Sequence, residues 1–366
     1  MKVVVDQDIP FLEGVLEPFA EVCTCKGSAI NADLVRDADA VLVRTRTRCD
    51  EALLAGSAVR FVGSATIGAD HVDLPVLQRL GIAFASVPGC NAGGVMQYVF
   101  TALYSLLARG TNVLPADPDG NWAKGRTLGV IGVGHVGSQV ERVAKALGFR
   151  VLACDPPRAA AEFAGCPEQS PFVDLVTLLD GADVVTVHVP LDKTTRGLIN
   201  ADFLARMKPG AILINSSRGP VADGAALVAA RKAGRLGGLV LDVWPDEPEL
   251  DPELLACADI ASPHIAGYSF EGKVNGTAGV VRAMAAYFGW ESLLDFIPSV
   301  EAASVPTWRL ADLRCESNAQ LARRFESVFD LPGISERLKA APSAFEAFRS
   351  SFHFRRELAF DFDEGG

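Results

Sequence analysis

Short apolar runs alternate along most of the chain with longer segments in which apolar residues recur every three or four positions. The short runs, rich in valine, isoleucine and leucine, predict buried strands, and the longer segments predict amphipathic helices. The predicted strands are Lys2–Val5, Ala40–Arg44, Phe61–Ser64, Ala83–Ser86, Leu128–Ile131, Arg150–Cys154, Val184–His188, Ala211–Asn215, Leu239–Val243 and Asp259–Ala261. This alternation predicts parallel sheets that are covered by helices.

Two longer segments predict helices that join separate sheets. Between Val95 and Leu107 the apolar residues follow the helical period of about 3.6 residues, and a second helical segment runs from about Phe270 to Phe288. We therefore expect one domain from residues 1–93 with a return segment at about 267–290, and a second domain from residues 94–266.

Residues 291–366 have a different character. They lack Gly-rich turns and carry helical patterns, such as Leu310–Val328 and Ala344–Phe354. A partly disordered tail is the alternative interpretation, but the many apolar positions argue against disorder. We expect a small third domain.

A glycine pattern lies on the turn between the predicted strand Leu128–Ile131 and a predicted helix, Val136–Leu147. Gly132, Gly134 and Gly137 form G-x-G-x-x-G. In a dinucleotide-binding turn the first glycine permits the tight turn, the second lets the backbone approach a pyrophosphate, and the third lets helix and strand pack closely. The alternative is a Gly-rich turn that only packs a helix.

An acidic residue supports the dinucleotide interpretation. Asp155 ends the next apolar run, and its distance from Gly132 is near the spacing of about 20 residues expected for a carboxylate that holds the adenosine ribose. A carboxylate there repels a 2′-phosphate, so NAD is favoured over NADP. Arg158 nearby weakens this preference slightly.

Composition narrows the class of partners. The 366 residues carry a net charge of −11, with an isoelectric point of about 5.0. This charge argues against nucleic acid or an anionic membrane as the main partner, but a local basic pocket still suits a small anionic substrate.

The eight cysteines are scattered without a C-x-x-C pair, which supports neither a zinc site nor a disulfide framework. We therefore predict no metal site and a reducing compartment. The first residues, Met1–Asp6, reach a charge too early for a signal peptide, and no apolar run has the length of about 18 residues that a membrane span needs. We expect a cytoplasmic protein.

Three polar segments each follow a predicted strand: Asn215–Gly219, Asp242–Pro248 and Ser262–Tyr268. Open α/β sheets bind ligands at the carboxyl ends of their strands. These segments are therefore the best candidates for an active site.

On these segments the chain resembles the D-isomer-specific 2-hydroxyacid dehydrogenases. The arginine, glutamate and histidine of that family match Arg218, Glu247 and His264. The chain is most similar to the members that act on 4-phospho-D-erythronate in vitamin B6 biosynthesis. The segments that carry this closer likeness are Met1–Asp6, Gly63–Asp73, Pro88–Ala92, Cys154–Ala159 and Pro263–Lys273. It is strong to about residue 285 and looser beyond.

The resemblance implies a fold, an assembly and a reaction. The implied fold has two doubly wound parallel-sheet domains, a Rossmann-type NAD domain and a flavodoxin-like substrate domain, with a small C-terminal α+β dimerisation domain at residues 291–366. It implies a homodimer that uses NAD to oxidise 4-phospho-D-erythronate to 2-oxo-3-hydroxy-4-phosphobutanoate.

The chemistry of such an oxidation suits the three matched residues. A hydroxyl proton must be removed while hydride leaves the same carbon, and an imidazole with a pKa near neutrality suits the proton step, so His264 is the candidate base. Glu247 would orient that imidazole, and Arg218 would bind the substrate carboxylate with its planar fork of donors. Taken singly, each has a structural alternative: a hydrogen-bonded strand-end histidine, a solvated loop glutamate and a surface arginine.

The resemblance also implies the cofactor contacts. Asp242 would accept a hydrogen bond from the nicotinamide carboxamide, with a helix cap as its alternative role. His135 either touches the pyrophosphate or faces solvent, and Val189 stands where relatives often have Thr. The full predicted set is Gly132, Gly134, His135, Val136, Gly137, Asp155, Val189, Ser216, Ser217, Arg218, Asp242 and Gly267.

The predicted substrate contacts also rest on the resemblance. Thr45, Thr66 and Tyr268 match positions that contact substrate in the 4-phosphoerythronate branch. Arg44, Arg46 and Arg48 would share one face if a strand continued through them, which suits a phosphate, although two or more of them are more readily explained as surface charges.

Other interpretations remain open. His71 fits a substrate-domain motif, and His188 fits the sheet. One open interpretation is that Arg355 and Arg356 reach the cleft of a neighbouring subunit. Competing functions are another D-2-hydroxyacid dehydrogenase, such as one acting on 3-phosphoglycerate, and a non-enzymatic NAD-sensing protein of the co-repressor type.

Overall fold

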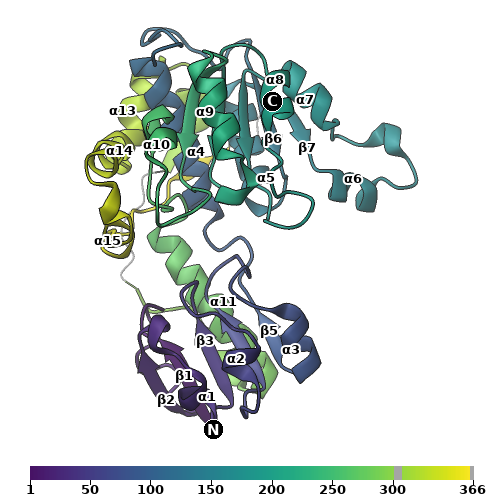
Figure 1. Cartoon of the computed structure of the whole chain (residues 1–366), viewed down its shortest axis with the longest axis vertical. Helices are drawn as coiled ribbons and strands as arrows, with labels where there is room; N and C mark the ends of the chain where they lie inside the picture. Colours follow the sequence, from purple (N-terminus) through teal and green to yellow (C-terminus); the bar gives the residue numbers. More distant parts are fainter. Residues whose placement is uncertain (301–306, 363–366) are drawn as a thin grey trace. The chain divides into compact units, whose positions relative to one another are not determined.

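The computed structural model describes residues 1–300 and 307–362, which form two compact units. Unit 1 comprises Met1–Asn91 and the described part of Ser269–Ser304. Unit 2 comprises Ala92–Tyr268 and the described part of Val305–Gly366. Each unit contains its own parallel sheet, coloured purple to blue in unit 1 and teal to green in unit 2 (Figure 1).

Unit 1 contains a five-stranded parallel sheet in the order β2-β1-β3-β4-β5. Its strands are β1 (Lys2–Asp6), β2 (Glu21–Cys25), β3 (Ala40–Val43), β4 (Phe61–Ser64) and β5 (Ala83–Ala85). This is the flavodoxin-like order, so the predicted fold of this region is confirmed. The edge strand β2 was not predicted, because its exposed Glu21 and Thr24 interrupt the apolar pattern.

Helices cover both faces of this sheet. They are α1 (Ala32–Val35), α2 (Glu51–Leu54), α3 (Leu74–Leu80) and α11 (Phe270–Phe288), with 3-10 turns η1 (Gly27–Ala29) and η4 (Glu291–Leu293). On one face, Val280 and Met284 of α11 join the buried cluster of Leu42 and Phe61. The long return helix that the sequence predicted therefore contributes to the core on one face of the unit 1 sheet.

Unit 2 contains a six-stranded parallel sheet in the order β11-β10-β9-β8-β6-β7. Its strands are β6 (Thr127–Ile131), β7 (Arg150–Cys154), β8 (Val184–Val187), β9 (Ala211–Asn215), β10 (Leu236–Leu241) and β11 (Ile260–Ala261). Beside β7, one isolated parallel bridge joins Ala153 to Phe172, at the place of the third strand of a Rossmann sheet. The predicted Rossmann-type domain is confirmed.

Two layers of helices cover the sheet of unit 2. The helices before the C-terminal region are α4 (Ala92–Arg109), α5 (His135–Leu147), α6 (Pro156–Glu162), α7 (Leu175–Gly181), α8 (Ala201–Arg206), α9 (Gly224–Lys232) and α10 (Pro252–Cys257), with 3-10 turns η2 (Pro167–Gln169) and η3 (Gly219–Val221). Residues of α4 and α5 pack on one sheet face, and residues of α7–α10 pack on the other. The helix predicted from Val95 to Leu107 extends one turn further at its amino end.

The C-terminal region adds short helices and a small sheet to unit 2. Its elements are β12 (Thr307–Arg309), α12 (Leu310–Leu313), α13 (Asn318–Val328), α14 (Leu331–Ala340), η5 (Pro342–Ala344), α15 (Phe345–Ser350) and β13 (Ala359–Asp361). Strands β12 and β13 pair in parallel, so the predicted small C-terminal α+β part is confirmed. Phe325 of α13 stacks on Tyr104 of α4 with ring centres 5.9 Å apart.

Two details of this region differ from the sequence pattern. The helical pattern Leu310–Val328 is divided into α12 and α13, because Ser317 and Gln320 form a capping box that starts a new helix. Helix α14 was not predicted. The separation of residues 291–366 as a domain of their own stays a prediction, since the described residues after 306 share the core of unit 2.

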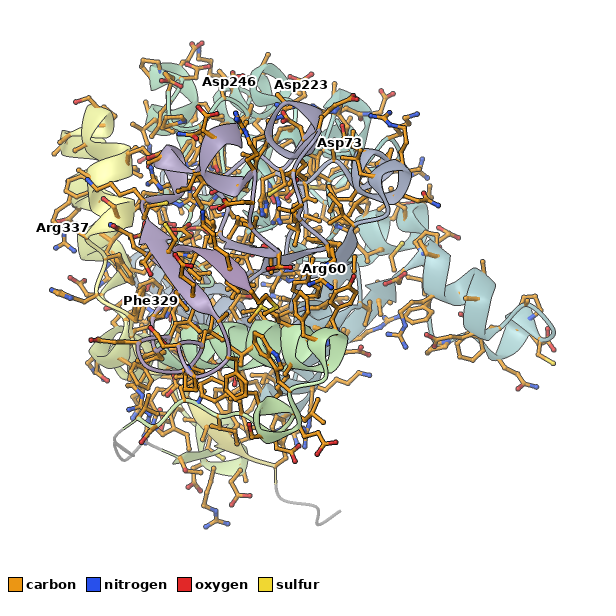
Figure 2. All side chains as sticks on the ribbon, turned by 90° about the horizontal axis from the view of Figure 1, so that it is seen from below. Arg60, Asp73, Asp223, Asp246, Phe329 and Arg337 are labelled. Carbon is orange, nitrogen blue, oxygen red and sulfur yellow. The ribbon has the colours of Figure 1, made fainter. Side chains whose placement is uncertain are left out.

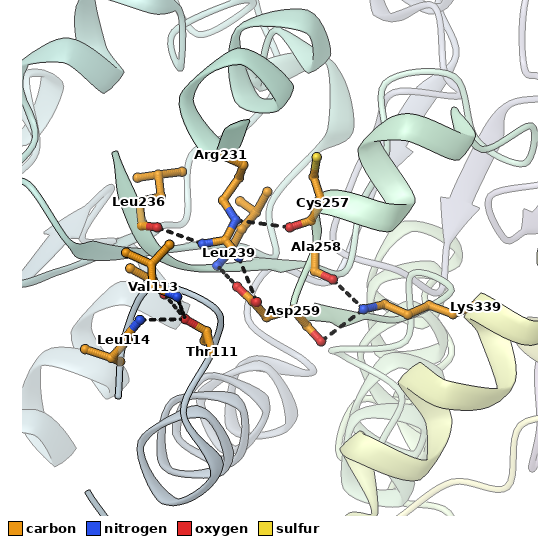
Figure 3. Close-up of polar contacts among 11 residues, drawn as sticks. Thr111, Val113, Leu114, Arg231, Leu236, Leu239, Cys257, Ala258, Asp259 and Lys339 are labelled. Carbon is orange, nitrogen blue, oxygen red and sulfur yellow. Dashed lines mark hydrogen bonds and ion pairs between the residues drawn. The ribbon is translucent and has the colours of Figure 1, made fainter. Parts of the chain in front are cut away.

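Partly buried polar contacts connect α9 with the amino ends of β10 and β11, and α14 with the amino end of β11 (Figure 3). Arg231 of α9 donates to Leu236 O at 2.7 Å and to Asp259 Oδ1 at 2.8 Å. Lys339 of α14 donates to the backbone oxygens of Ala258 and Asp259. These bonds lie at the opposite end of the strands from the predicted site, and they attach the C-terminal region to the sheet.

Candidate active site

The glycine turn has the geometry that a dinucleotide requires. Gly132 has a φ of 83°, and a Cβ atom there would lie 2.7 Å from His188 O. A Cβ on Gly137 would lie 2.0 Å from Gly132 O, whereas a Cβ on Gly134 would meet open space. Gly132 and Gly137 are therefore required by the fold itself, and Gly134 leaves the backbone accessible to a ligand.

The amino end of α5 is open to an anion. Gly134 is its N-cap residue and provides no side-chain cap, so the first backbone N–H groups of α5 keep their donor capacity. His135 begins this helix and is exposed, and Val136 is partly buried behind it. The turn therefore fits the pyrophosphate of a dinucleotide.

Asp155 connects the turn to the following helix. Its Oδ2 accepts from Val133 N at 2.8 Å, and its Oδ1 accepts from Arg158 N at 3.0 Å as the N-cap of α6. Arg158 forms an ion pair with Glu162 at 2.6 Å, which partly neutralises the guanidinium. The carboxylate thus lies beside the glycine turn, where a ribose hydroxyl of a bound dinucleotide would be expected.

Two further strand ends line the same edge of the sheet. Val189 follows β8 and lies near Gly132. After β9, Ser217 Oγ donates to Asn215 Oδ1 at 2.8 Å, while the buried Ser216 Oγ has no hydrogen-bond partner among the described residues. A buried hydroxyl without a partner is costly, and a ligand that supplies one removes the cost. This observation also fits a bound cofactor.

The loop after β11 is held by a buried carboxylate. Asp242, which follows β10, is 1% exposed and accepts from Ser262 Oγ at 2.7 Å, Ile265 N at 2.8 Å and Ala266 N at 2.9 Å. His264 N donates to Asp242 O at 2.8 Å. The carboxylate is thus engaged within the protein, and its predicted bond to the nicotinamide carboxamide stays a prediction.

His264 has a backbone conformation that is rare for a residue with a side chain. Its φ is 55°, which lies in the left-handed region and costs on the order of 1–3 kcal/mol unless the surroundings enforce it. The hydrogen bonds to Asp242 enforce it here. This backbone conformation directs the imidazole of His264 toward a carboxylate.

That carboxylate belongs to Glu247. His264 Nδ1 forms a hydrogen bond with Glu247 Oε1, and Trp244 N donates to Glu247 Oε2 at 3.2 Å. Burial by itself raises the pKa of Glu247, but the hydrogen bond and charge of His264, with the charge of Arg349, lower the pKa below its ordinary value. A carboxylate on Nδ1 leaves Nε2 as the ring nitrogen on the side away from Glu247.

Arg218 follows Ser217 at the end of β9. Its Nη1 donates to Ser217 O at 2.8 Å, and its backbone oxygen accepts from Asn215 Nδ2 at 3.2 Å. Arg218, Glu247 and His264 therefore all extend from carboxyl ends of strands in one sheet, on the edge that also carries the glycine turn.

Known proteins are similar to this chain in sequence. Residues 101–266 match the family model "D-isomer specific 2-hydroxyacid dehydrogenase, NAD binding domain". An erythronate-4-phosphate dehydrogenase from Edwardsiella ictaluri is 42% identical over 98% of this chain and 93% of its own length. Another from Klebsiella pneumoniae is 44% identical over 79% of this chain and 74% of its own length.

The chain belongs to the erythronate-4-phosphate dehydrogenase family.

A solved structure supports the assignment at the level of the fold and the cofactor. The D-lactate dehydrogenase of Aquifex aeolicus, crystallised with NAD and lactic acid, is 26% identical. It matches 82% of this chain and 100% of its own with a TM-score of 0.67. The dinucleotide site of the present chain is an NAD site, in agreement with Asp155 and the glycine turn.

The predicted substrate residues of the present chain lie in both units. In unit 1, Thr66 Oγ1 lies 2.8 Å from Ser64 Oγ, which also contacts His71 Nε2 at 3.2 Å. Thr45 is exposed. In unit 2, Tyr268 follows the partly buried Gly267 and packs against aromatic rings of the C-terminal region.

The arginine cluster does not take the form that would have supported a phosphate site. Strand β3 ends at Val43, so the alternation of a strand does not continue through the three arginines. Arg44 Nη1 donates to Asp8 O at 2.9 Å, and Arg48, 83% exposed, pairs with Asp50 at 3.1 Å. These two side chains are engaged within unit 1.

Two arginines of the C-terminal region were missed or misplaced by sequence reasoning. Arg355 is not directed to a neighbouring subunit, because it is 7% exposed and donates to backbone oxygens of its own unit. The charge of Arg349 lowers the pKa of Glu247, yet Arg349 carries no sequence signal, because it belongs to no motif.

Within residues 1–300 and 307–362, no three or more His, Cys, Asp and Glu residues come together in a way that would hold a metal ion. No helix in the same ranges has both the length and the apolar character needed to cross a membrane.

Proposed function

We propose that this protein oxidises 4-phospho-D-erythronate to 2-oxo-3-hydroxy-4-phosphobutanoate with NAD, a step of pyridoxine and pyridoxal 5′-phosphate biosynthesis. The observation that carries the proposal is the His264–Glu247 pair on the sheet edge that bears the NAD turn. The name shared by the similar proteins supplies the substrate.

The residues have distinct tasks in this reaction. His264 Nε2 takes the proton of the C2 hydroxyl, and Glu247 stabilises the imidazolium that results. Arg218 binds the substrate carboxylate and polarises the C2 oxygen. NAD supplies the acceptor for the hydride that leaves C2, so that a carbonyl and NADH are formed. Thr45, Thr66 and Tyr268 hold the remainder of the substrate.

NAD would be held by the residues of the sheet edge. The α5 amino end with Gly134, His135 and Val136 would bind the pyrophosphate, and Asp155 would accept from the ribose hydroxyls. Val189, Ser216, Ser217, Asp242 and Gly267 complete the predicted set. The open position at Gly134 and the unpartnered Ser216 hydroxyl support this placement.

We further propose a cytoplasmic homodimer in which residues 291–366 form the dimerisation domain. The acidic composition and scattered cysteines support the location. Sedimentation of the purified protein tests the assembly, because a monomer at micromolar concentration would contradict it.

The reaction is tested by adding 4-phospho-D-erythronate to the purified protein and following the absorbance of reduced nicotinamide, from bound or added NAD. Reduction is expected with this substrate. Activity on 3-phosphoglycerate with none on 4-phosphoerythronate would reject the substrate. Binding of NAD without turnover of any phosphorylated hydroxy acid would favour an NAD-sensing protein.

A further inference from the structure

Helix α15 carries a second guanidinium into the neighbourhood of the Glu247–His264 pair. The side chain of Arg349 is 15% exposed, and its guanidinium carbon lies 5.9 Å from the centre of the Tyr268 ring. Its Nη1 lies 3.8 Å from Glu346 Oε1, and its buried Nε has no hydrogen-bond partner among the described residues. A desolvated cation with spare donor capacity thus lies beside the proposed site.

Charges link Arg349 to the catalytic carboxylate. The charged groups that act on Glu247 are the His264 imidazole and the Arg349 guanidinium, and both lower its pKa against the opposing effect of burial. Burial lowers the pKa of Arg349, but Tyr268, Glu247 and Glu346 together raise it above its ordinary value. The guanidinium therefore remains charged, and it acts on Glu247 together with the His264 imidazole.

The position of Arg349 is fixed by the segment that follows it. Arg355 donates to Ile265 O at 3.1 Å, Tyr268 O at 2.9 Å and Gly94 O at 2.7 Å, and also to Ala266 O. The rings of Phe352 and Phe354 meet the Tyr268 ring edge-on, with centres 6.3 Å and 6.2 Å away. The C-terminal segment thus grips the loop that carries His264.

We propose that Arg349 is a positioning residue of the active site that acts through Glu247 and Tyr268. Its charge keeps the Glu247 carboxylate ionised, and this carboxylate interacts with both the Arg349 guanidinium and the His264 imidazole. Its guanidinium also lies over the face of the Tyr268 ring. The proposal rests on the proposed function of His264 and Glu247.

The test compares Arg349→Gln, Arg349→Lys and Arg337→Gln in the full chain. Arg337 on α14 is a matched control: it is exposed at the side of the molecule (Figure 2) and borders the same cavity as Pro263 and Ile265. In Arg349→Gln, the acid limb of the profile of kcat/KM against pH should move to higher pH by about half a unit or more, because a positive charge near the imidazole is lost.

The conservative variant Arg349→Lys distinguishes a positioning role of the charge from a purely structural role of the side chain. Arg349→Lys should return the limb to within about 0.2 pH unit of the unmodified protein, and Arg337→Gln should not move it. A fall in activity of Arg349→Gln with no movement of the limb would overturn the proposal, as would an equal shift in Arg337→Gln.

A second readout does not depend on turnover. The chain has five histidines, so the His264 imidazole signal is assignable by NMR from its loss in His264→Gln. Its titration midpoint should rise in Arg349→Gln and return in Arg349→Lys. If 4-phosphoerythronate is not oxidised but the midpoint moves, the substrate proposal fails and the link through Glu247 stands. An unmoved midpoint overturns the link whatever the substrate.

Discussion

In unit 2 the loop after β11 is gripped from both sides, whereas in unit 1 the loop after β3 leaves Thr45 exposed to solvent. Asp242 accepts from the amides of Ile265 and Ala266, and Arg355 donates to the carbonyls of the same two residues. In unit 1, the contacts of the Thr66 hydroxyl among residues 1–300 and 307–362 are local ones, with Ser64 and Gly68.

This difference separates two tasks. A proton acceptor must be held close to its productive geometry, which requires buried polar partners that fix the backbone. Side chains that contact the variable part of a substrate tolerate more freedom, because each provides a modest share of the binding energy. We therefore expect substitutions in the gripped loop to affect turnover or folding, and substitutions in unit 1 to affect substrate affinity.

The largest expected effect is that of His264→Ala. Loss of the proton acceptor should lower kcat by about 10³-fold, the middle of the range for general base catalysis. The affinity for NAD, measured by calorimetry, should stay within about twofold, because the imidazole is assigned to the substrate and not to the dinucleotide. Turnover near that of the unmodified protein would remove His264 from the base role.

Arg355→Met should have the next largest effect, on stability. The backbone oxygens of Gly94, Ile265, Ala266 and Tyr268 would lose a charged donor inside the protein. Buried acceptors left without partners cost free energy, so the free energy of unfolding should fall by about 3 kcal/mol or more.

A matched substitution in unit 1 sharpens this prediction. Arg48→Met removes an arginine that is 83% exposed and pairs only with Asp50 among the contacts described for it, so urea unfolding should change little. Equal losses in the two variants would contradict the contrast between the gripped loop and the exposed one.

The same contrast explains what the sequence could predict. The glycine turn, Asp155 and the strand ends were predictable because their requirements are local: a positive φ at Gly132 and close approach of Gly137 to Gly132 O are needed by any such turn. The proposed catalytic residues followed from their places after predicted strands and from the resemblance. These features lie within a few residues of a recognisable motif.

The contacts of the C-terminal region were not predictable in this way. Arg355 meets Gly94 and Ile265 across a long stretch of intervening chain, and no periodicity or spacing marks such a pairing. The edge strand β2 was missed because partial exposure interrupts its apolar pattern. Helix α14 was missed because its amino end, Leu331-Pro332-Gly333, reads as a turn even though Pro is favoured there.

Thr66→Val should show the smaller effect expected in unit 1. The valine keeps the shape of threonine but loses the hydroxyl that contacts Ser64, so KM for 4-phosphoerythronate should rise by up to about 10-fold with kcat changed less. Steady-state kinetics with Thr45→Val as a companion measures both loops of unit 1. A fall in kcat as large as that of His264→Ala would show that the first loop takes part in the chemistry.

The smallest predicted effect concerns acid stability and His188, which directly follows β8 in unit 2. Burial lowers its pKa to about 3, and Thr186 Oγ1 lies 3.0 Å from its Nε2. An unfolded histidine takes up its proton near pH 6.5, so the unfolded state binds more protons below that pH, and stability is lost as the pH falls from about 6.5 towards 3.

His188→Asn removes this proton uptake. Between pH 7 and pH 5 the ligand-free protein should lose about 1 kcal/mol more stability than the variant, after allowance for the partial exposure of the ring. Urea unfolding at the two pH values measures the difference, and His135→Asn, at an exposed position of the same unit, serves as the control. Parallel losses in His188→Asn and the unmodified protein would mean that solvent reaches the His188 ring, and that the end of β8 is as open as the first loop of unit 1.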